Sequence, residues 1–239
     1  MKIVEKFKAK IADNMGADGV TIAFLGDSVT QGCFEIHRDA KGIQTVFDKG
    51  AAYHNYIAKI FSVLYPSVPI NIINAGISGD NAPHGYERLE KDVLRHNPDL
   101  VVVCFGLNDV GYGREGLFKY LEALGSIFAR LKKEGIEAIF MTPNMLNTEI
   151  SMQLTDAQML KIAENTKKLQ LDGVFDEYIN AAVKLCEENG VKVCDCYKKW
   201  KLLEASGANV TELLANKINH PTREMNWLFA YSLVETMLN

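Results

Sequence analysis

Five short runs of apolar residues recur along the chain, and segments with helical periodicity separate them. Each run is about the length of a single strand and is largely apolar, which is typical of parallel strands covered on both faces. The predicted strands are Val20–Leu25, Ile70–Asn74, Leu100–Phe105, Ala138–Thr142 and Val191–Asp195.

Between the strands, apolar residues return at the spacing of one helix face. The longest stripe predicts a helix carrying Leu117, Leu121, Leu124, Phe128 and Leu131. A second helix is predicted over Ala51–Leu64, and a third is marked by Tyr86, Leu89 and Val93. A fourth runs from Phe175 to Cys186, with Gly190 as its C-cap. The last is predicted to begin near Pro221 and to carry Trp227, Leu228, Tyr231 and Val234.

The alternation of strands and helices predicts an α/β fold. Repeated strand–helix units require right-handed crossovers, which build a parallel sheet with helices on both faces. No repeat, low-complexity tract or linker divides the chain, so residues 1–239 are predicted to form a single domain. Two longer stretches, Gln31–Gly50 and Pro143–Thr155, are predicted to be irregular. Both follow strands and are expected at the ligand-binding edge of the sheet.

Composition narrows the class of protein. The chain has 239 residues, of which 48% are hydrophobic and 23% are charged, as in ordinary globular domains. A net charge of −4 gives no electrostatic basis for nucleic-acid binding, and no apolar run approaches the ~20 residues that span a membrane. The N-terminal segment shows no signal-peptide pattern, and the five cysteines form no Cys-x-x-Cys pair. We therefore expect a cytoplasmic protein with reduced thiols.

The cysteines also bear on metal binding. Cys194-Asp195-Cys196 has two thiols close together, but no second pair of Cys or His residues accompanies them. Cys104 lies inside a predicted strand. We interpret these thiols as strand packing and expect no metal and no cofactor.

The first predicted strand ends abruptly in Gly26-Asp27-Ser28. Gly26 permits a sharp turn, and a serine beyond it lies at the carboxyl edge where α/β sheets bind ligands. Ser28 can present its hydroxyl to a substrate there. Alternatively, Asp27 and Ser28 simply cap the next helix. Taken alone, the three residues favour a cap.

Three further signals stand where a site is expected. Asn74–Asp80 follows the second strand, and its glycines leave backbone amides exposed to a ligand. Asn108 follows the third strand in Gly106-Leu107-Asn108-Asp109, and its amide can donate to a developing negative charge. His220 stands immediately before Pro221, at the predicted start of the last helix. Together with Ser28 they supply a nucleophile, a base and oxyanion donors, as acyl transfer requires.

In these four blocks the chain resembles the SGNH hydrolases, the GDSL-type esterases and lipases. The resemblance implies a three-layer α/β/α, flavodoxin-like sandwich with a five-stranded parallel sheet. It also implies that Ser28 is the nucleophile and His220 its general base. The oxyanion hole is implied to comprise the amides of Ser28 and Gly79 and the side chain of Asn108.

One block departs from the family pattern. An aspartate usually stands three residues before the histidine, and here that residue is Lys217. Lysine cannot fix the imidazole tautomer or stabilise imidazolium. We expect a Ser–His dyad whose His220 Nδ1 donates to a backbone carbonyl near Lys217. Glu224 and Glu212 are the nearest alternative acids, and Asp27 is a further supporting residue.

The resemblance implies a small-molecule ester as substrate. Without a hydrophobic lid or a membrane-seeking helix, we favour small acyl groups such as acetyl, carried on carbohydrates. The segment His37–Tyr56, with Asp39, Phe47, Tyr53 and His54, suits a polar ester or an ordinary surface loop. Lysophospholipase or thioesterase activity is the alternative within the family. Outside it, a non-catalytic flavodoxin-like module would use Ser28–Gly32 to bind a phosphate.

Overall fold

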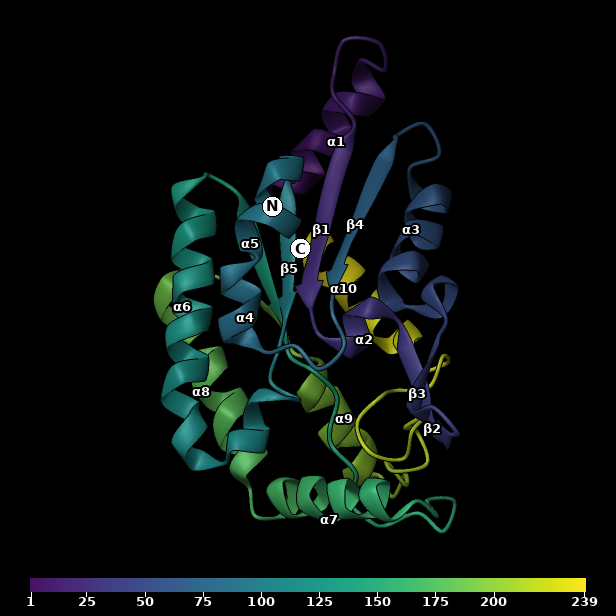
Figure 1. The fold of residues 1–239 in the computed structure, drawn as a ribbon. Coiled ribbons are helices and arrows are strands. Elements are labelled where there is room, and N and C mark those ends of the chain that lie inside the picture. Colours follow the sequence, from purple (N-terminus) through teal and green to yellow (C-terminus); the bar gives the residue numbers. More distant parts are fainter.

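A five-stranded parallel sheet forms the centre of the protein in the computed structural model, which describes residues 1–239 (Figure 1). The spatial order is β4-β1-β5-β6-β7, which is the order of flavodoxin-like doubly wound folds. The strands are β1 Val20–Gly26, β4 Ile70–Gly76, β5 Leu100–Cys104, β6 Glu137–Met141 and β7 Lys192–Cys194. All five predicted strands are confirmed, each within two residues at either end.

Helices cover both faces of the sheet and complete three layers. α10 packs against α3 and α1 on one face, and α6 packs against α4 and α8 on the other. α7 lies beyond the carboxyl ends of the strands, at the bottom of Figure 1. The α-helices are α1 Lys2–Ala12, α2 Ser28–Gln31, α3 Tyr53–Leu64, α4 Ala82–Glu87, α5 Leu89–Asp92, α6 Leu117–Lys133, α7 Ala157–Leu171, α8 Val174–Asn189, α9 Cys196–Ala205 and α10 Asn226–Leu238. The 3₁₀ helices are η1 Lys49–Ala51, η2 Leu94–His96, η3 Asp109–Tyr112 and η4 Arg114–Gly116.

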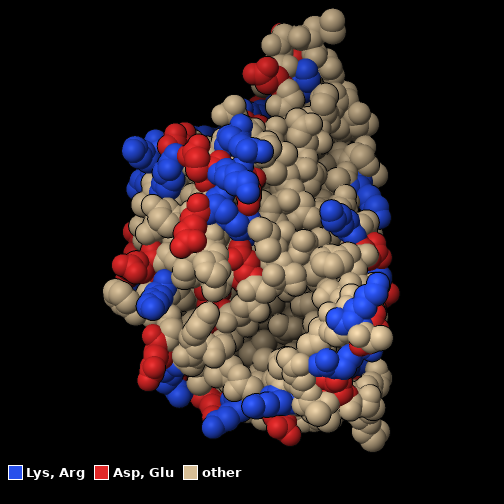
Figure 2. All heavy atoms as spheres, in the orientation of Figure 1, with Lys and Arg blue, Asp and Glu red and all other residues tan.

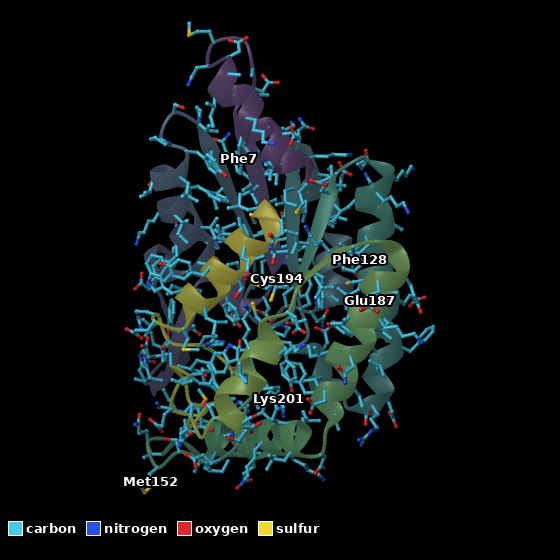
Figure 3. All side chains as sticks on the ribbon, turned by 180° about the vertical axis from the view of Figure 1, so that it is seen from behind. Phe7, Phe128, Met152, Glu187, Cys194 and Lys201 are labelled. Atoms are coloured by element: carbon cyan, nitrogen blue, oxygen red, sulfur yellow. The ribbon has the colours of Figure 1, made fainter.

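The core explains why the predicted strands are apolar. Every residue of β5 is buried, because β1 and β6 flank this strand and helices cover both of its faces. Seen from behind, α10 crosses the sheet below Phe7 of α1 and close to Cys194 of β7 (Figure 3). The main cluster of buried apolar side chains contains 56 residues drawn from the sheet and both helical layers.

The segment Gln31–Gly50 is not irregular, and that prediction is wrong. It forms an antiparallel hairpin of β2 Cys33–Asp39 and β3 Gly42–Phe47, with a shift in pairing between Cys33 and Ile36. This hairpin stands apart from the parallel sheet and projects beyond its carboxyl edge (Figure 1). Pro143–Thr155, by contrast, contains no helix or strand, as predicted.

The last helix begins later than predicted, at Asn226. Pro221 pairs with Leu214 in an antiparallel bridge, and the Ala215 amide donates to the His220 carbonyl (2.7 Å). Because these bonds keep the backbone extended, a helix cannot start at Pro221. His220 therefore lies on a loop and not directly before a helix.

Two other predictions need correction. The helix expected through Tyr86, Leu89 and Val93 is divided into α4 and α5 at Arg88, whose side chain turns toward the strand ends. Only Cys194 of the Cys194-Asp195-Cys196 motif lies in a strand, because the Asp195 carboxylate caps α9 by accepting from the Lys198 amide (3.0 Å). The sequence pattern did not indicate α1, α7 or α9.

Candidate active site

A serine and a histidine meet at the carboxyl edge of the sheet. Ser28 is the first residue of α2, immediately after β1, and His220 comes from the loop before α10. The Ser28 Oγ lies 2.9 Å from the His220 Nε2, and both residues are only 3% exposed. The fold therefore brings together two predicted site residues that are 192 positions apart.

The turn that carries Ser28 is fixed by contacts close to it in the sequence. The Asp27 Oδ1 accepts from the Val29 amide (3.0 Å) and caps α2. Gly26 is needed for space and not for unusual backbone angles. A Cβ at Gly26 would lie 2.2 Å from the Thr30 Oγ1 and 2.7 Å from the Cys104 carbonyl. The strand can thus meet α2 so closely only because residue 26 has no side chain.

Arg88, which the sequence reasoning missed, ties this turn to the neighbouring strand. Its guanidinium donates to the carbonyls of Gly26 (2.9 Å) and Ala75 (2.6 Å), at the ends of β1 and β4. It also pairs with the Asp80 carboxylate at 2.6 Å. Because two of its acceptors are backbone carbonyls, no sequence motif indicates that Arg88 joins the two strand ends.

The three predicted oxyanion donors lie on segments that bond directly to one another. The Ile77 amide donates to the Gly26 carbonyl (3.1 Å), which places the loop after β4 beside Ser28. Gly79 has a φ of +78°, a conformation that favours glycine, and its amide donates to no protein acceptor. The Asn108 Nδ2 donates one hydrogen to the Asp80 carbonyl (2.8 Å), which fixes the amide while its other hydrogen remains available.

A backbone carbonyl orients His220. The His220 Nδ1 lies 2.9 Å from the carbonyl oxygen of Phe34, in β2. Nδ1–H therefore donates to Phe34, and Nε2 is left to accept from the Ser28 hydroxyl; this tautomer is assigned from the two bonds. A carbonyl partner was predicted, but its expected position near Lys217 is wrong. The hairpin supplies it instead.

The acids considered as substitutes for the missing aspartate make no bond to the imidazole. Lys217 adopts a φ of +58°, and its Nζ lies 2.8 Å from the Glu212 Oε2. Glu212 is thereby paired with Lys217, while Glu224 is exposed to solvent. The residue at the usual aspartate position thus points to a neighbouring carboxylate and not to His220.

Amide side chains shape the loop around His220. The Asn216 Oδ1 accepts from the amides of Ile218 (3.0 Å), Asn219 (2.9 Å) and His220 (2.9 Å). The Asn144 Nδ2 donates to the Asn219 carbonyl at 2.8 Å. An asparagine four residues before the histidine was the only signal of this arrangement in the sequence.

Arg223 joins the histidine loop to the hairpin. Its guanidinium binds both carboxylate oxygens of Glu35 (2.6 and 3.1 Å) and the Asp48 Oδ2 (2.9 Å). It also lies over the Phe34 ring, 4.4 Å from the centroid. The bond from the His220 Nδ1 to the Phe34 carbonyl also joins the histidine loop to the hairpin. Arg223 therefore holds together the same two segments.

Burial sets the protonation states of the site. It lowers the pKa of His220 to about 4, although the bond to Phe34 and the charge of Glu35 both oppose this shift. His220 is therefore neutral near pH 7 and able to accept a proton. Burial also raises the pKa of Asp27 to about 7, and the charges of Asp109 and Asp80 add to that rise.

Two residues of the predicted substrate segment are internal. The Tyr53 hydroxyl bonds to the Thr30 Oγ1 (2.9 Å), and the His54 Nε2 bonds to the Thr30 carbonyl (3.0 Å). Both side chains therefore bond to Thr30 and help to hold α2 in place. No group of three His, Cys, Asp or Glu side chains is placed to hold a metal ion.

The carboxyl edge of the sheet is hollowed. Figure 2 shows a depression in the lower half of this face, with an uncharged floor and charged side chains around its rim. A Ser–His pair with unused amide donors can attack an ester carbonyl and stabilise the resulting charge. The geometry is that of a serine-dependent acyl hydrolase.

Comparison with known proteins gives the family. Residues 24–228 match the model of the GDSL-like lipase/acylhydrolase family. The chain belongs to this family, which confirms the resemblance that the four blocks carry. It is 29% identical over 178 residues to an acetylxylan esterase of Geobacillus stearothermophilus, a match that covers 67% of this chain and 80% of the relative.

Solved structures share the fold. An acetyl-xylooligosaccharide esterase variant from Geobacillus superposes with a TM-score of 0.67 at 22% identity, covering 92% of this chain and 94% of the other. An acetyl xylan esterase gives 0.66 at 22% identity, covering 90% and 98%. A two-domain esterase active on acetylated mannans gives 0.66 at 16% identity, covering 97% of this chain and 52% of the other. None of the helices is long and apolar enough to cross a membrane.

Proposed function

We propose that this protein is a serine esterase that removes small acyl groups, acetyl in particular, from carbohydrates. The observation that carries the proposal is the bonded chain from Ser28 through His220 to the Phe34 carbonyl. It gives the serine an adjacent neutral base in the tautomer that nucleophilic attack requires.

The reaction begins when the Ser28 Oγ attacks the ester carbonyl and its proton passes to the His220 Nε2. The carbonyl oxygen becomes an oxyanion, which the amides of Ser28 and Gly79 and the Asn108 Nδ2 stabilise. His220 then protonates the departing sugar oxygen, and the acyl group stays on Ser28. Water next attacks the acyl-enzyme as His220 removes its proton. His220 then returns this proton to the Ser28 Oγ, which releases the acid and restores the serine hydroxyl.

The substrate class draws its support from the relatives and from the surface. The curated relative is an acetylxylan esterase, and two of the similar structures are esterases of acetylated xylan or xylooligosaccharides. An open hollow with an uncharged floor suits a neutral polar ester better than a long acyl chain, which would need an enclosed apolar tunnel.

We also propose that residues 1–239 act as one domain, since one large core cluster draws on the sheet and on both helical layers. All five cysteines are buried as free thiols. This supports our proposal that the enzyme works in a reducing compartment such as the cytoplasm.

The test has two parts. A fluorophosphonate probe should label the protein stoichiometrically at Ser28, mapped by peptide mass spectrometry. The exposed Ser78, changed to alanine, serves as the matched control and should leave the labelling intact. Hydrolysis is then compared across acetylated xylose oligomers, 4-nitrophenyl acetate, a lysophospholipid and a long-chain acyl thioester. Absence of labelling at Ser28 would contradict the mechanism, and faster turnover of the lipid or thioester would contradict the substrate class.

A further inference from the structure

A second hollow lies beside the proposed oxyanion site. It is a cavity of about 440 Å³ between α4, η3, η4 and the start of α6. Cavities that bind small molecules have about this volume, ~300–1,000 Å³. The mechanism proposed above uses none of its lining residues, which include Asn81, His84, Asp109, Tyr112, Glu115 and Lys119.

Asp109 lines this cavity and carries a buried acceptor without a partner. Its Oδ1 accepts from the Ala82 amide (2.9 Å), but its Oδ2 is buried and has no protein partner. A buried polar atom without a partner costs roughly 1–3 kcal/mol, so a donor that reaches this oxygen is bound favourably. Burial also raises the pKa of Asp109 to about 6, as expected for a carboxylate held away from water.

The wall of the cavity has mixed chemistry. Glu115 and Lys119 are exposed on it and form no ion pair, while His84 stands on the opposite side, on α4. Tyr112 is 68% exposed and offers a flat ring. Carboxylates oppose an anionic ligand, and the lysine opposes a cationic one. A neutral ring compound with several hydroxyl groups can donate to Asp109, bond to both charge types and lie against the tyrosine.

The cavity adjoins the reacting centre through two short segments. Asp109 follows Asn108 directly, and Asn81 lies two residues after Gly79. We infer that this cavity binds the carbohydrate part of the substrate while its acyl group lies at Ser28, with the Asp109 Oδ2 accepting from a sugar hydroxyl. The inference rests on the proposed function and extends it. It assigns the sugar to residues that take no part in the proposed catalysis, and all of them except Asp109 lie outside the four family blocks.

The experiment compares two substrates in the full-length enzyme. Tyr112→Ala and Lys119→Ala should raise KM for an acetylated xylose oligomer by about 3- to 10-fold, as expected for the loss of one contact each. Neither should change kcat for that substrate, or KM for 4-nitrophenyl acetate, which has no sugar. Asp109→Asn keeps an acceptor for the Ala82 amide. It should likewise raise KM for the oligomer alone, and a thermal melt checks its fold.

Matched controls come from the same elements. Lys132→Ala removes a lysine from the far end of α6, and Phe118→Ala removes an exposed aromatic that does not line the cavity. Both should leave KM for each substrate unchanged. If the cavity variants behave like these controls, or raise KM for both substrates equally, the sugar does not bind there. If the unaltered enzyme hydrolyses neither substrate, the proposed function itself fails.

Discussion

The two halves of the proposed catalytic pair are held in place in opposite ways. Ser28 stands at the junction of a sheet strand and a helix, and contacts within or beside the sheet fix its turn: the Asp27 cap, the packing of Thr30 and the Arg88 bonds to strand ends. His220 stands on a loop whose only regular pairing is one isolated bridge. The Asn216 side chain of its own loop and the Phe34 carbonyl of the distant hairpin hold it.

Because of this difference, we expect the regions around Ser28 and His220 to tolerate substitutions differently. Strand register determines the position of Ser28, so most nearby substitutions act on it only by changing local packing. The position of His220 depends on three partners, namely Asn216, the Phe34 carbonyl and, through the hairpin, Arg223. We expect the serine side to fail when a reacting group is removed or when a side chain is added at Gly26. The histidine side should weaken in steps as its supports are removed.

Ser28→Ala should have the largest effect, because it removes the nucleophile and leaves the turn intact. Loss of a serine nucleophile lowers kcat by ~10⁶ in enzymes of this chemistry. Hydrolysis of 4-nitrophenyl acetate measures the loss, and an unchanged thermal midpoint shows that the fold survives. Turnover near the unaltered rate would end the covalent mechanism.

Asn108→Ala tests an oxyanion donor on the same rigid side. We expect kcat to fall by ~10²–10³ with little change in KM, because the donor acts on charge that develops only in the transition state. The Asn108 Nδ2 also holds the Asp80 carbonyl, so a thermal melt must accompany the kinetics. A change confined to KM would make Asn108 a substrate-positioning residue instead.

Arg223→Ala tests the histidine side. Removing the link between loop and hairpin should lower kcat by about 10- to 100-fold, the size expected from a misplacement of roughly 1 Å. KM for 4-nitrophenyl acetate should stay unchanged. The acid limb of the pH–kcat/KM profile should move upward, because Glu35 loses its partner and its charge then raises the pKa of His220 more strongly.

Two further variants sharpen the Arg223 test. Arg223→Lys should recover part of the rate, since lysine keeps the charge but cannot form the two-pronged bond to Glu35. Arg114→Ala breaks an exposed pair with Glu177 and is the control, expected to leave kcat unchanged. Equal kcat in all three variants would show that the hairpin needs no such link.

Glu212→Gln and Glu224→Gln should each change kcat by less than about threefold. Neither carboxylate bonds to the imidazole, whereas neutralising a true triad acid costs ~10⁴. The comparison is made at saturating 4-nitrophenyl acetate. A loss above about 100-fold in either variant would mean that a carboxylate orients His220 during turnover and would replace the dyad with a triad.

Asp27→Asn should affect stability and not the reaction. The folded-state pKa of about 7 lies above the ordinary value of 3.8, so ionising the buried group opposes folding as the pH rises between these values. Asparagine can keep the cap without the charge. The variant should melt higher than the parent at pH 8, and the difference should vanish near pH 4. Equal melting curves at pH 8 would show that Asp27 is not strained when charged.

Short motifs at strand ends explain how much was predictable. Apolar runs specify buried parallel strands and so indicate the edge of the sheet. Ser28, Gly79 and Asn108 stand three to five residues after the ends of the predicted strands, and the resemblance to the SGNH hydrolases singled them out. The hairpin was missed because its exposed strands alternate weakly, as the charges in Glu35-Ile36-His37-Arg38-Asp39 show. Arg88 was missed because it binds carbonyls. The true partner of His220 is also a carbonyl, and a carbonyl has no residue type to recognise.

The carbonyl partner of His220 has a genetic consequence. Phe34 stands six positions after Ser28, and any amino acid at that position supplies the same carbonyl oxygen. A survey of substitutions should therefore find position 34 constrained only by packing and position 217 only by its φ of +58°, so neither would mark the third member of the proposed catalytic unit. Insertions and deletions should reveal it. One codon gained or lost between Ser28 and Phe34 would move the oxygen away from His220. The length of this short segment therefore positions the group that orients the histidine, as an aspartate does in other family members.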